Sequence, residues 1–171
     1  MQYLVFFSLS LLIIVLQTTI MPNIFGLLWF YDLIVPLVIY FSLYRPFREG
    51  FPVLFLAAMM MDMISGAPPG IYLTTYIWLY LAFRQTWRFF DVKQSHLFPV
   101  VVIIGVVFQQ LVFWIVISLQ AGHFVFSAGG IRLVFFQMLW AVVSSPIIFL
   151  LLQRLFGVTD RLFAGKVYDA K

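Results

Sequence analysis

Long apolar blocks, separated by short polar or charged stretches, run along the whole chain. Turn-forming residues divide these blocks. Pro22-Asn23 follows the first block, and the Ser-Gly-Ala-Pro-Pro-Gly turn at residues 65–70 separates the third block from the fourth. A helix needs roughly 20 apolar residues to cross the hydrocarbon core of a bilayer. The pattern therefore predicts an all-α membrane protein with six transmembrane helices, at about residues 3–20, 32–44, 50–64, 71–83, 97–119 and 131–152.

The third and fourth predicted helices are short. The residues from 50 to 64, at about 1.5 Å per residue, span only roughly 22 Å, which is less than the thickness of a standard hydrocarbon core. Residues 50–64 and 69–83 could therefore form a re-entrant hairpin that enters from the cytoplasmic side, since that arrangement leaves the charged loops on the same side. We favour two crossings because bilayer thinning and helix tilt cost little.

The composition agrees with a lipid environment. Hydrophobic residues make up 64% of the 171 residues and charged residues only 9%, whereas a soluble domain carries roughly a quarter charged residues to cover its surface. The chain has no cysteine, so disulfides, thiolate chemistry and cysteine-ligated metals are excluded. Residues 1–16 contain no Lys or Arg, and residues 18–22 make a poor cleavage site, so we interpret the first block as a retained helix.

The basic residues indicate the orientation of the helices. The net charge is +4, but Lys and Arg lie at the edges of the apolar blocks, which favours a topological role over a nucleic-acid surface. With the N-terminus inside, nine of the ten basic residues are cytoplasmic: Arg45, Arg48, Arg84, Arg88, Lys93, Arg154, Arg161, Lys166 and Lys171. The positive-inside rule therefore predicts two cytoplasmic termini. The predicted domains are a six-helix transmembrane domain at residues 1–153 and a short basic cytoplasmic tail at residues 154–171.

Asp62 is the first candidate for a functional residue, because it lies within an apolar run. Acidic side chains in such positions are costly and usually face a bundle interior or a watery cavity. Two structural interpretations compete with a functional one: Asp62 reaches headgroup water near the outer end of the third helix, or it caps the backbone of the turn at residues 65–70. We favour the structural interpretations, because acids in unusual surroundings are often structural.

Asp32 and Arg132 are the other charged candidates on the outer side. Asp32 begins the second helix, where Asp is a favoured N-cap and its charge suits the helix dipole, and we favour that role. Arg132 is the basic residue that the predicted topology leaves outside. We expect Arg132 either to pair with Asp32 or Asp62, because charges in a low-dielectric setting seek partners, or to snorkel to the outer headgroups.

Uncharged polar and small residues also lie in or near the predicted helices. Four glutamines are expected to form hydrogen bonds between helices, each of modest energy: Gln17, Gln109, Gln110 and Gln137. A patch of small residues beside Pro146 should let a neighbouring helix approach closely: Ala141, Ser144 and Ser145.

Motifs for catalysis, cofactors and metals are absent from the sequence. It contains no G-x-S-x-G, no phosphate-binding glycine loop and no H-E-x-x-H. His96 and His123 lie on opposite sides of the membrane in the predicted topology, so they cannot share a metal ion. We therefore expect a protein that is not an enzyme and that has no catalytic, cofactor or metal site.

Two stretches within residues 31–83 carry a recognisable pattern. The first is YDLIVPLVIY at residues 31–40, followed by a short basic loop and Gly50. The second is DMISGAPPGIY at residues 62–72: an Asp, two apolar residues, a small-Gly turn, then Pro-x-Gly and a helix start. Together they resemble the family of the bacterial rod shape-determining protein MreD. The match departs at Pro69, where family members commonly have Leu, and outside residues 31–83 it extends only to hydrophobicity and length.

The resemblance implies a role in the cell-elongation machinery of rod-shaped bacteria. MreD-like proteins are multi-pass proteins of the inner (cytoplasmic) membrane that bind MreC. Their complex is linked to MreB and to peptidoglycan synthesis by a SEDS polymerase and a class B penicillin-binding transpeptidase. The resemblance also implies a fold similar to the substrate-binding component of energy-coupling-factor transporters. It further implies that an outer turn positions the third and fourth helices for a partner, through Asp62, Gly66, Pro68 and Gly70.

The sequence therefore leads to two expectations about function. The first is a noncatalytic inner-membrane scaffold that binds MreC, with the SEDS polymerase, the transpeptidase and, indirectly, MreB as further partners, together with membrane lipids and without nucleic acid. The alternative is the substrate-binding membrane component of a small-molecule transporter. That alternative predicts an outer cavity with converging polar groups, for which Asp32, Asp62 and Arg132 are the candidate lining.

Overall fold

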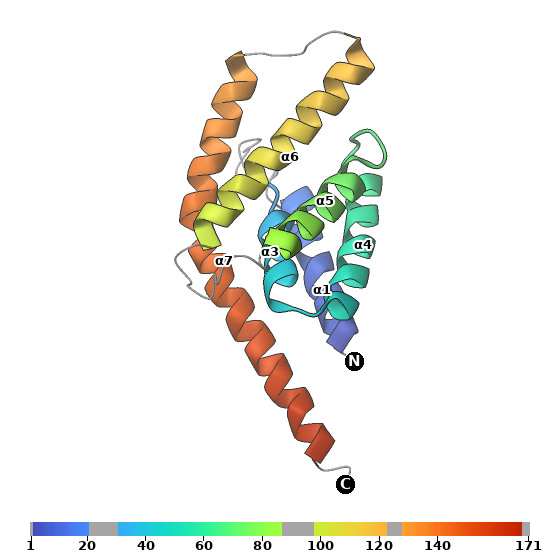
Figure 1. Cartoon of the computed structure of the whole chain (residues 1–171), viewed down its shortest axis with the longest axis vertical. Coiled ribbons are helices and arrows are strands. Elements are labelled where there is room, and N and C mark those ends of the chain that lie inside the picture. The colour runs from blue at the N-terminus through green and yellow to red at the C-terminus, as the bar shows by residue number, and fades with distance from the viewer. Residues whose placement is uncertain (1, 21–30, 87–97, 123–127, 169–171) are drawn as a thin grey trace.

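The structure, a computed structural model, describes residues 2–20, 31–86, 98–122 and 128–168, and this part of the chain is helical without any strand. Its elements are shown in Figure 1: α1 (Gln2–Val15), η1 (Leu16–Ile20), α3 (Ile34–Tyr44), α4 (Phe47–Ile64), α5 (Ile71–Thr86), α6 (Phe98–Ala121) and α7 (Ala128–Tyr168). The all-α prediction is confirmed, and each of the six apolar blocks has a helical counterpart.

The helix boundaries differ from the predicted ones where charged residues enter a helix. Helix α4 begins at Phe47, because the Pro46 carbonyl accepts hydrogen bonds from the amides of Glu49 (3.0 Å) and Gly50 (3.1 Å) and so starts the helix before the apolar block. Helix α7 continues without a break to Tyr168, past the predicted domain boundary at residue 153. Leu, Arg and Lys are good helix formers, so the backbone stays helical where the apolar block ends.

Helix α3 forms the centre of the bundle. Every residue from Ile34 to Ser42 is buried, and α3 packs against α1, α4, α5, α6 and α7. Gly105 of α6 permits one of these close approaches, since a Cβ atom there would lie 2.9 Å from side-chain atoms of both Val35 and Ile39. Other helices therefore surround this short helix, and it presents almost no side chain to the surroundings of the protein.

Helices α6 and α7 form a hairpin that reaches beyond the other helices, and the C-terminal half of α7 extends past the opposite end of the bundle (Figure 1). Residues Phe98–Ala121 and Gly129–Gly157 are long and apolar enough to cross a membrane, and only 22% of the most apolar window of each is buried within the protein. Apolar side chains that a protein leaves uncovered are compatible with a lipid environment.

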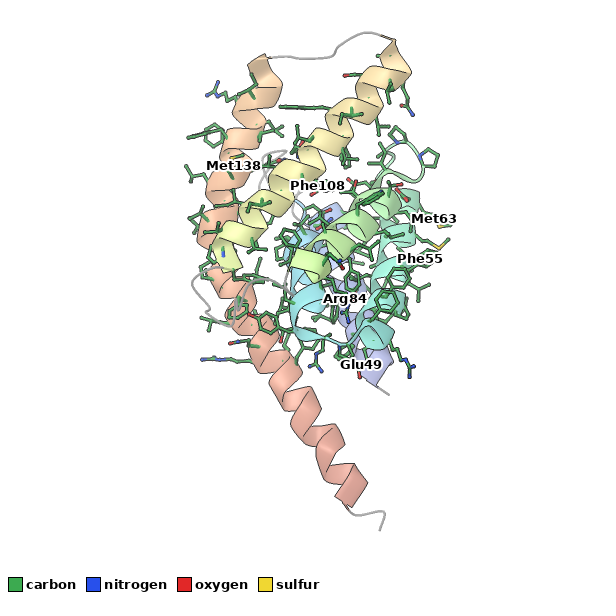
Figure 2. All side chains as sticks on the ribbon, in the orientation of Figure 1. Glu49, Phe55, Met63, Arg84, Phe108 and Met138 are labelled. Atoms are coloured by element: carbon green, nitrogen blue, oxygen red, sulfur yellow. The ribbon has the colours of Figure 1, made fainter. Side chains whose placement is uncertain are left out.

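Helices α4 and α5 pack against each other and are joined by the turn at residues 65–70. Their 18 and 16 residues correspond to about 27 and 24 Å. Figure 2 shows Phe55 and Met63 of α4 pointing away from the bundle, and their side chains are 38% and 79% exposed. The pair thus contributes one face to the core and leaves another apolar face uncovered.

Candidate functional site

Asp32 lies at the entrance to α3 and accepts hydrogen bonds from several parts of the chain. Its Oδ1 accepts one from the Ile34 amide (2.9 Å) and one from Gln17 Nε2 (3.0 Å). Its Oδ2 accepts one from Gln109 Nε2 (2.9 Å) and one from the Tyr76 hydroxyl. A carboxylate offers about four acceptor positions, so the protein itself occupies the hydrogen-bonding capacity of Asp32.

The partners of Asp32 come from separate elements, which makes the carboxylate a junction between them. Gln17 lies in η1, Tyr76 in α5 and Gln109 in α6. Gln17 also accepts a hydrogen bond from the Leu33 amide through Oε1 (3.0 Å). Gln17 and Asp32 therefore satisfy two backbone amides at the start of α3, which have no acceptor within the helix. We call Asp32, Gln17, Tyr76 and Gln109 the Asp32 centre.

The expectation that Asp32 is the N-cap of its helix is met only in part, because Leu33 holds the N-cap position and Asp32 lies one residue before it. Asp32 still accepts a hydrogen bond from the first amide of α3, that of Ile34, and this is only one of the four contacts of its carboxylate. Gln17 and Gln109 do bond between helices, as expected of the glutamines, and so do Gln110 and Gln137 (2.6 Å). The sequence analysis missed Tyr76, because a tyrosine in an apolar block looks like any other aromatic residue until its hydroxyl is located.

Next to the Asp32 centre, Tyr31 connects the start of α3 to α7. Its hydroxyl lies 2.6 Å from Ser144 Oγ. Ser144 donates its own proton to the Trp140 carbonyl (2.7 Å), so Tyr31 is the donor in the first bond. Ala141 and Ser145, from the same patch of small residues, are fully buried. The patch therefore packs closely, as predicted, and Ser144 in addition binds a neighbouring segment.

Asp62 has a local structural role at the start of α5. Its two carboxylate oxygens accept hydrogen bonds from the amides of Tyr72 (2.9 Å) and Leu73 (3.1 Å). The preceding turn depends on two glycines with positive φ, Gly66 (68°) and Gly70 (89°), a conformation that is strained for other residues. The capping interpretation of Asp62 is thus supported, although the capped amides belong to the helix after the turn.

Arg132 does not pair with either aspartate. The hydrogen bonds of Asp32 and Asp62 within the described residues go to amides, glutamines and a tyrosine. The Arg132 guanidinium lies 5.9 Å from the centre of the Phe136 ring, on the same helix, and the residue is exposed. Of the two alternatives for Arg132, the ion pair is therefore wrong, because both carboxylates accept hydrogen bonds from nearer donors within the bundle.

Among the described residues, no group of three His, Cys, Asp or Glu side chains could hold a metal ion. His96 and His123 lie outside the described part of the chain. The saturated Asp32 centre has no carboxylate position left for a ligand unless one of its bonds is replaced.

A hollow of about 480 Å³ opens at the end of the bundle that carries Arg45 and Arg84. It is lined by Ser42, Leu43, Tyr44, Arg45, Leu81, Arg84 and Gln85. Asp32, Asp62 and Arg132, which the transporter alternative placed in a ligand cavity, do not line it. The carboxylates and the hollow are thus separate features of the molecule.

Comparisons with protein-family models, with curated proteins and with solved structures found no match to this chain.

Proposed function

We propose that this chain is a noncatalytic scaffold of the bacterial cell-elongation machinery, resembling MreD, that spans the inner membrane six times and binds MreC. Its termini are cytoplasmic in this proposal, and its fold is similar to that of the substrate-binding component of energy-coupling-factor transporters. The SEDS polymerase and the class B penicillin-binding transpeptidase join the same assembly, and MreB is linked to it indirectly.

The observation that carries the proposal is the geometry of residues 62–72, the more specific of the two stretches behind the resemblance. Asp62 caps α5, and Gly66 and Gly70 have positive φ. The Pro68 carbonyl accepts a hydrogen bond from the Ile71 amide (3.3 Å) and completes the turn. Three of the residues that carry the resemblance, Asp62, Gly66 and Gly70, are thus of types that suit this turn.

Two further features support a membrane scaffold. The α6–α7 hairpin leaves large apolar side chains uncovered, including Phe135, Leu139 and Ile147 at 63%, 52% and 61% exposure. Lipid tails or the helix of a bitopic partner are suited to such a surface. The start of α1 and the end of α7 lie toward the same end of the bundle (Figure 1), which supports an even number of crossings.

The hydrogen bonds that already occupy Asp32 and Asp62 support a scaffold over an enzyme or a transporter. A functional carboxylate needs a position open to its substrate or ligand. Asp32 is bound by four donors of the protein, and both oxygens of Asp62 hold backbone amides. Structural residues have such contacts, which gives the transporter alternative less support.

Co-purification from native membranes in mild detergent, followed by mass spectrometry of the retained proteins, tests the proposal. We expect MreC to be recovered together with the wall-synthesis proteins. Gly70→Leu, which strains the turn, and Asp62→Ala, which removes the cap, should reduce recovery of MreC. Gly157→Ala is the matched control, because a Cβ atom at Gly157 meets nothing within 4 Å and this glycine is helical.

The same experiment can contradict the proposal. Recovery of paired ATPases with a small membrane coupling protein would identify a transporter subunit instead. Unchanged recovery of MreC by both turn variants, with the variants folded, would remove the turn from the interface.

A further inference from the structure

The hollow between the C-terminal ends of α3 and α5 combines positive charge with apolar surface. Among the described residues, its lining contains two arginines, Arg45 and Arg84, and no carboxylate. Leu43, Tyr44 and Leu81 contribute apolar surface to the same hollow, and Leu81 is 42% exposed. Figure 2 places Arg84 toward the end of the bundle from which the C-terminal half of α7 emerges.

Aromatic rings and backbone groups hold both guanidinium groups in place. Arg84 Nη1 donates to the Arg45 carbonyl (3.2 Å) and to the Tyr80 hydroxyl (3.2 Å), and the Arg84 guanidinium lies 5.6 Å from the centre of the Phe47 ring. The Arg45 guanidinium lies 5.1 Å from the Phe6 ring centre and 5.2 Å from that of Phe156. Arginines fixed in this way lose little conformational entropy when they bind an anion.

Arg84 also offsets negative charge at the C-terminal end of α3, which would repel an anion. The C-terminal end of a helix carries partial negative charge on carbonyls that lack a partner within the helix. Arg84 covers one of them, the Arg45 carbonyl that follows α3. Among the residues that the structure describes, Arg84 Nη2 and Nε have no acceptor, so they remain available as donors to a ligand.

We propose that this hollow binds the phosphate of an anionic phospholipid from the leaflet that adjoins the end of the bundle carrying Arg45 and Arg84. Arg84, with Arg45, holds the phosphate through charge-assisted hydrogen bonds. Leu43 and Leu81 contact the first carbons of the lipid chains. The volume of about 480 Å³ lies in the range of sites for small organic ligands, roughly 300 to 1,000 Å³. The mixed lining and this volume favour a lipid over inorganic phosphate.

Lipid binding requires that the end of the bundle carrying Arg45 and Arg84 lies at a membrane surface, but it does not depend on which protein partner the chain binds. Glu49 lies 3.9 Å from Arg45, outside the lining of the hollow, and it offsets part of the Arg45 charge. Arg84 is therefore expected to contribute more to anion binding than Arg45.

Native mass spectrometry of the full chain in neutral detergent tests the proposal, with titration by phosphatidylglycerol, phosphatidylcholine or inorganic phosphate. We expect preferential retention of phosphatidylglycerol. Arg84→Gln should weaken its binding roughly tenfold, the effect of losing a charge-assisted contact. Arg48→Gln is the matched control, because Arg48 is exposed in the same basic region and does not line the hollow.

A second variant tests the hollow without removing the contacts that Arg84 makes in the folded protein. Gln85→Glu adds a negative charge at an exposed position of the lining and leaves the Arg84 contacts intact, so it should also weaken phosphatidylglycerol binding. Equal binding of the two lipids, or equal weakening by Arg48→Gln and Arg84→Gln, would overturn the proposal. Arg84-dependent binding of inorganic phosphate without binding of phosphatidylglycerol would also overturn it, since the ligand would then be a free anion.

Discussion

Asp32 and Asp62 both lie in apolar surroundings, yet they stabilise the protein in different ways. Asp62 binds two amides that lie 10 and 11 residues further along the chain, so its partners are set by one turn. Asp32 binds side chains that lie 15, 44 and 77 residues away, so its partners are set by the packing of several helices. The comparison separates a local cap from a centre that depends on the tertiary structure.

Replacement of Asp32 should have the largest effect on stability. Asp32→Ala leaves Gln17, Tyr76, Gln109 and the Ile34 amide without their shared acceptor. We expect a loss of about 2 to 4 kcal/mol in the free energy of unfolding, because several buried donors lose a partner at once. Unfolding by SDS in mixed micelles, followed by circular dichroism, measures this change.

Asp32→Asn is the matched control, since it keeps the shape of the side chain and one acceptor oxygen. We expect its loss of stability to be smaller than that of Asp32→Ala. A loss for Asp32→Ala no greater than that for Asp62→Ala would contradict the distinction between the two aspartates.

Gly70→Ala should have the next largest effect and should act on the turn alone. Gly70 has a φ of 89°, and a Cβ atom there would meet nothing within 4 Å. The cost is therefore backbone strain without a steric clash, and we expect about 1 to 2 kcal/mol. The same unfolding experiment measures it.

Gly157→Ala provides the comparison, because the same added methyl group in an open helical position should be neutral or stabilising by up to about 1 kcal/mol. If both alanines changed stability equally, the positive φ of the turn would not be the cause.

Asp62→Ala should cost less than the loss of the Asp32 centre, about 1 kcal/mol, which is typical of a lost helix cap. Hydrogen exchange at the Tyr72 and Leu73 amides should rise selectively, because these amides lose their acceptors. Met63→Ala is a neighbouring control at an exposed position, and it should leave exchange at both amides unchanged. Protection that persists in Asp62→Ala would exclude the cap.

The smallest expected effect is the coupling between Gln110 of α6 and Gln137 of α7. Their side chains form a hydrogen bond of 2.6 Å, and such bonds in membrane proteins average about 0.6 kcal/mol. A double-mutant cycle with Gln110→Leu and Gln137→Leu measures the coupling. Pairing Gln110→Leu with Asp62→Ala should instead give additive changes, since Gln110 is bonded to Gln137 whereas Asp62 is bonded to the Tyr72 and Leu73 amides.

Prediction from the sequence succeeded where the partners are local or the pattern is long. The turn at residues 65–70 was recognised from its glycines and prolines, and Asp62 was among the expected caps. The same reasoning treated Asp32 as a cap alone and offered an ion pair with an aspartate as one of two alternatives for Arg132. Both shortcomings concern contacts between helices, because hydrophobic periodicity places a residue on a helix but leaves undetermined which helices adjoin it.

The sequence by itself determined the helical character of the chain, the approximate position of each helix and the clustering of basic residues between the apolar blocks. Long apolar runs, turn residues and charges act locally, so a linear pattern is sufficient to reveal them. Only the tertiary structure decided that α3 is enclosed, that Tyr76 and Gln109 meet Asp32, and that Arg45 and Arg84 border one hollow. These contacts join residues far apart in sequence, and the angles and distances at which the helices pack decide whether their side chains can reach one another.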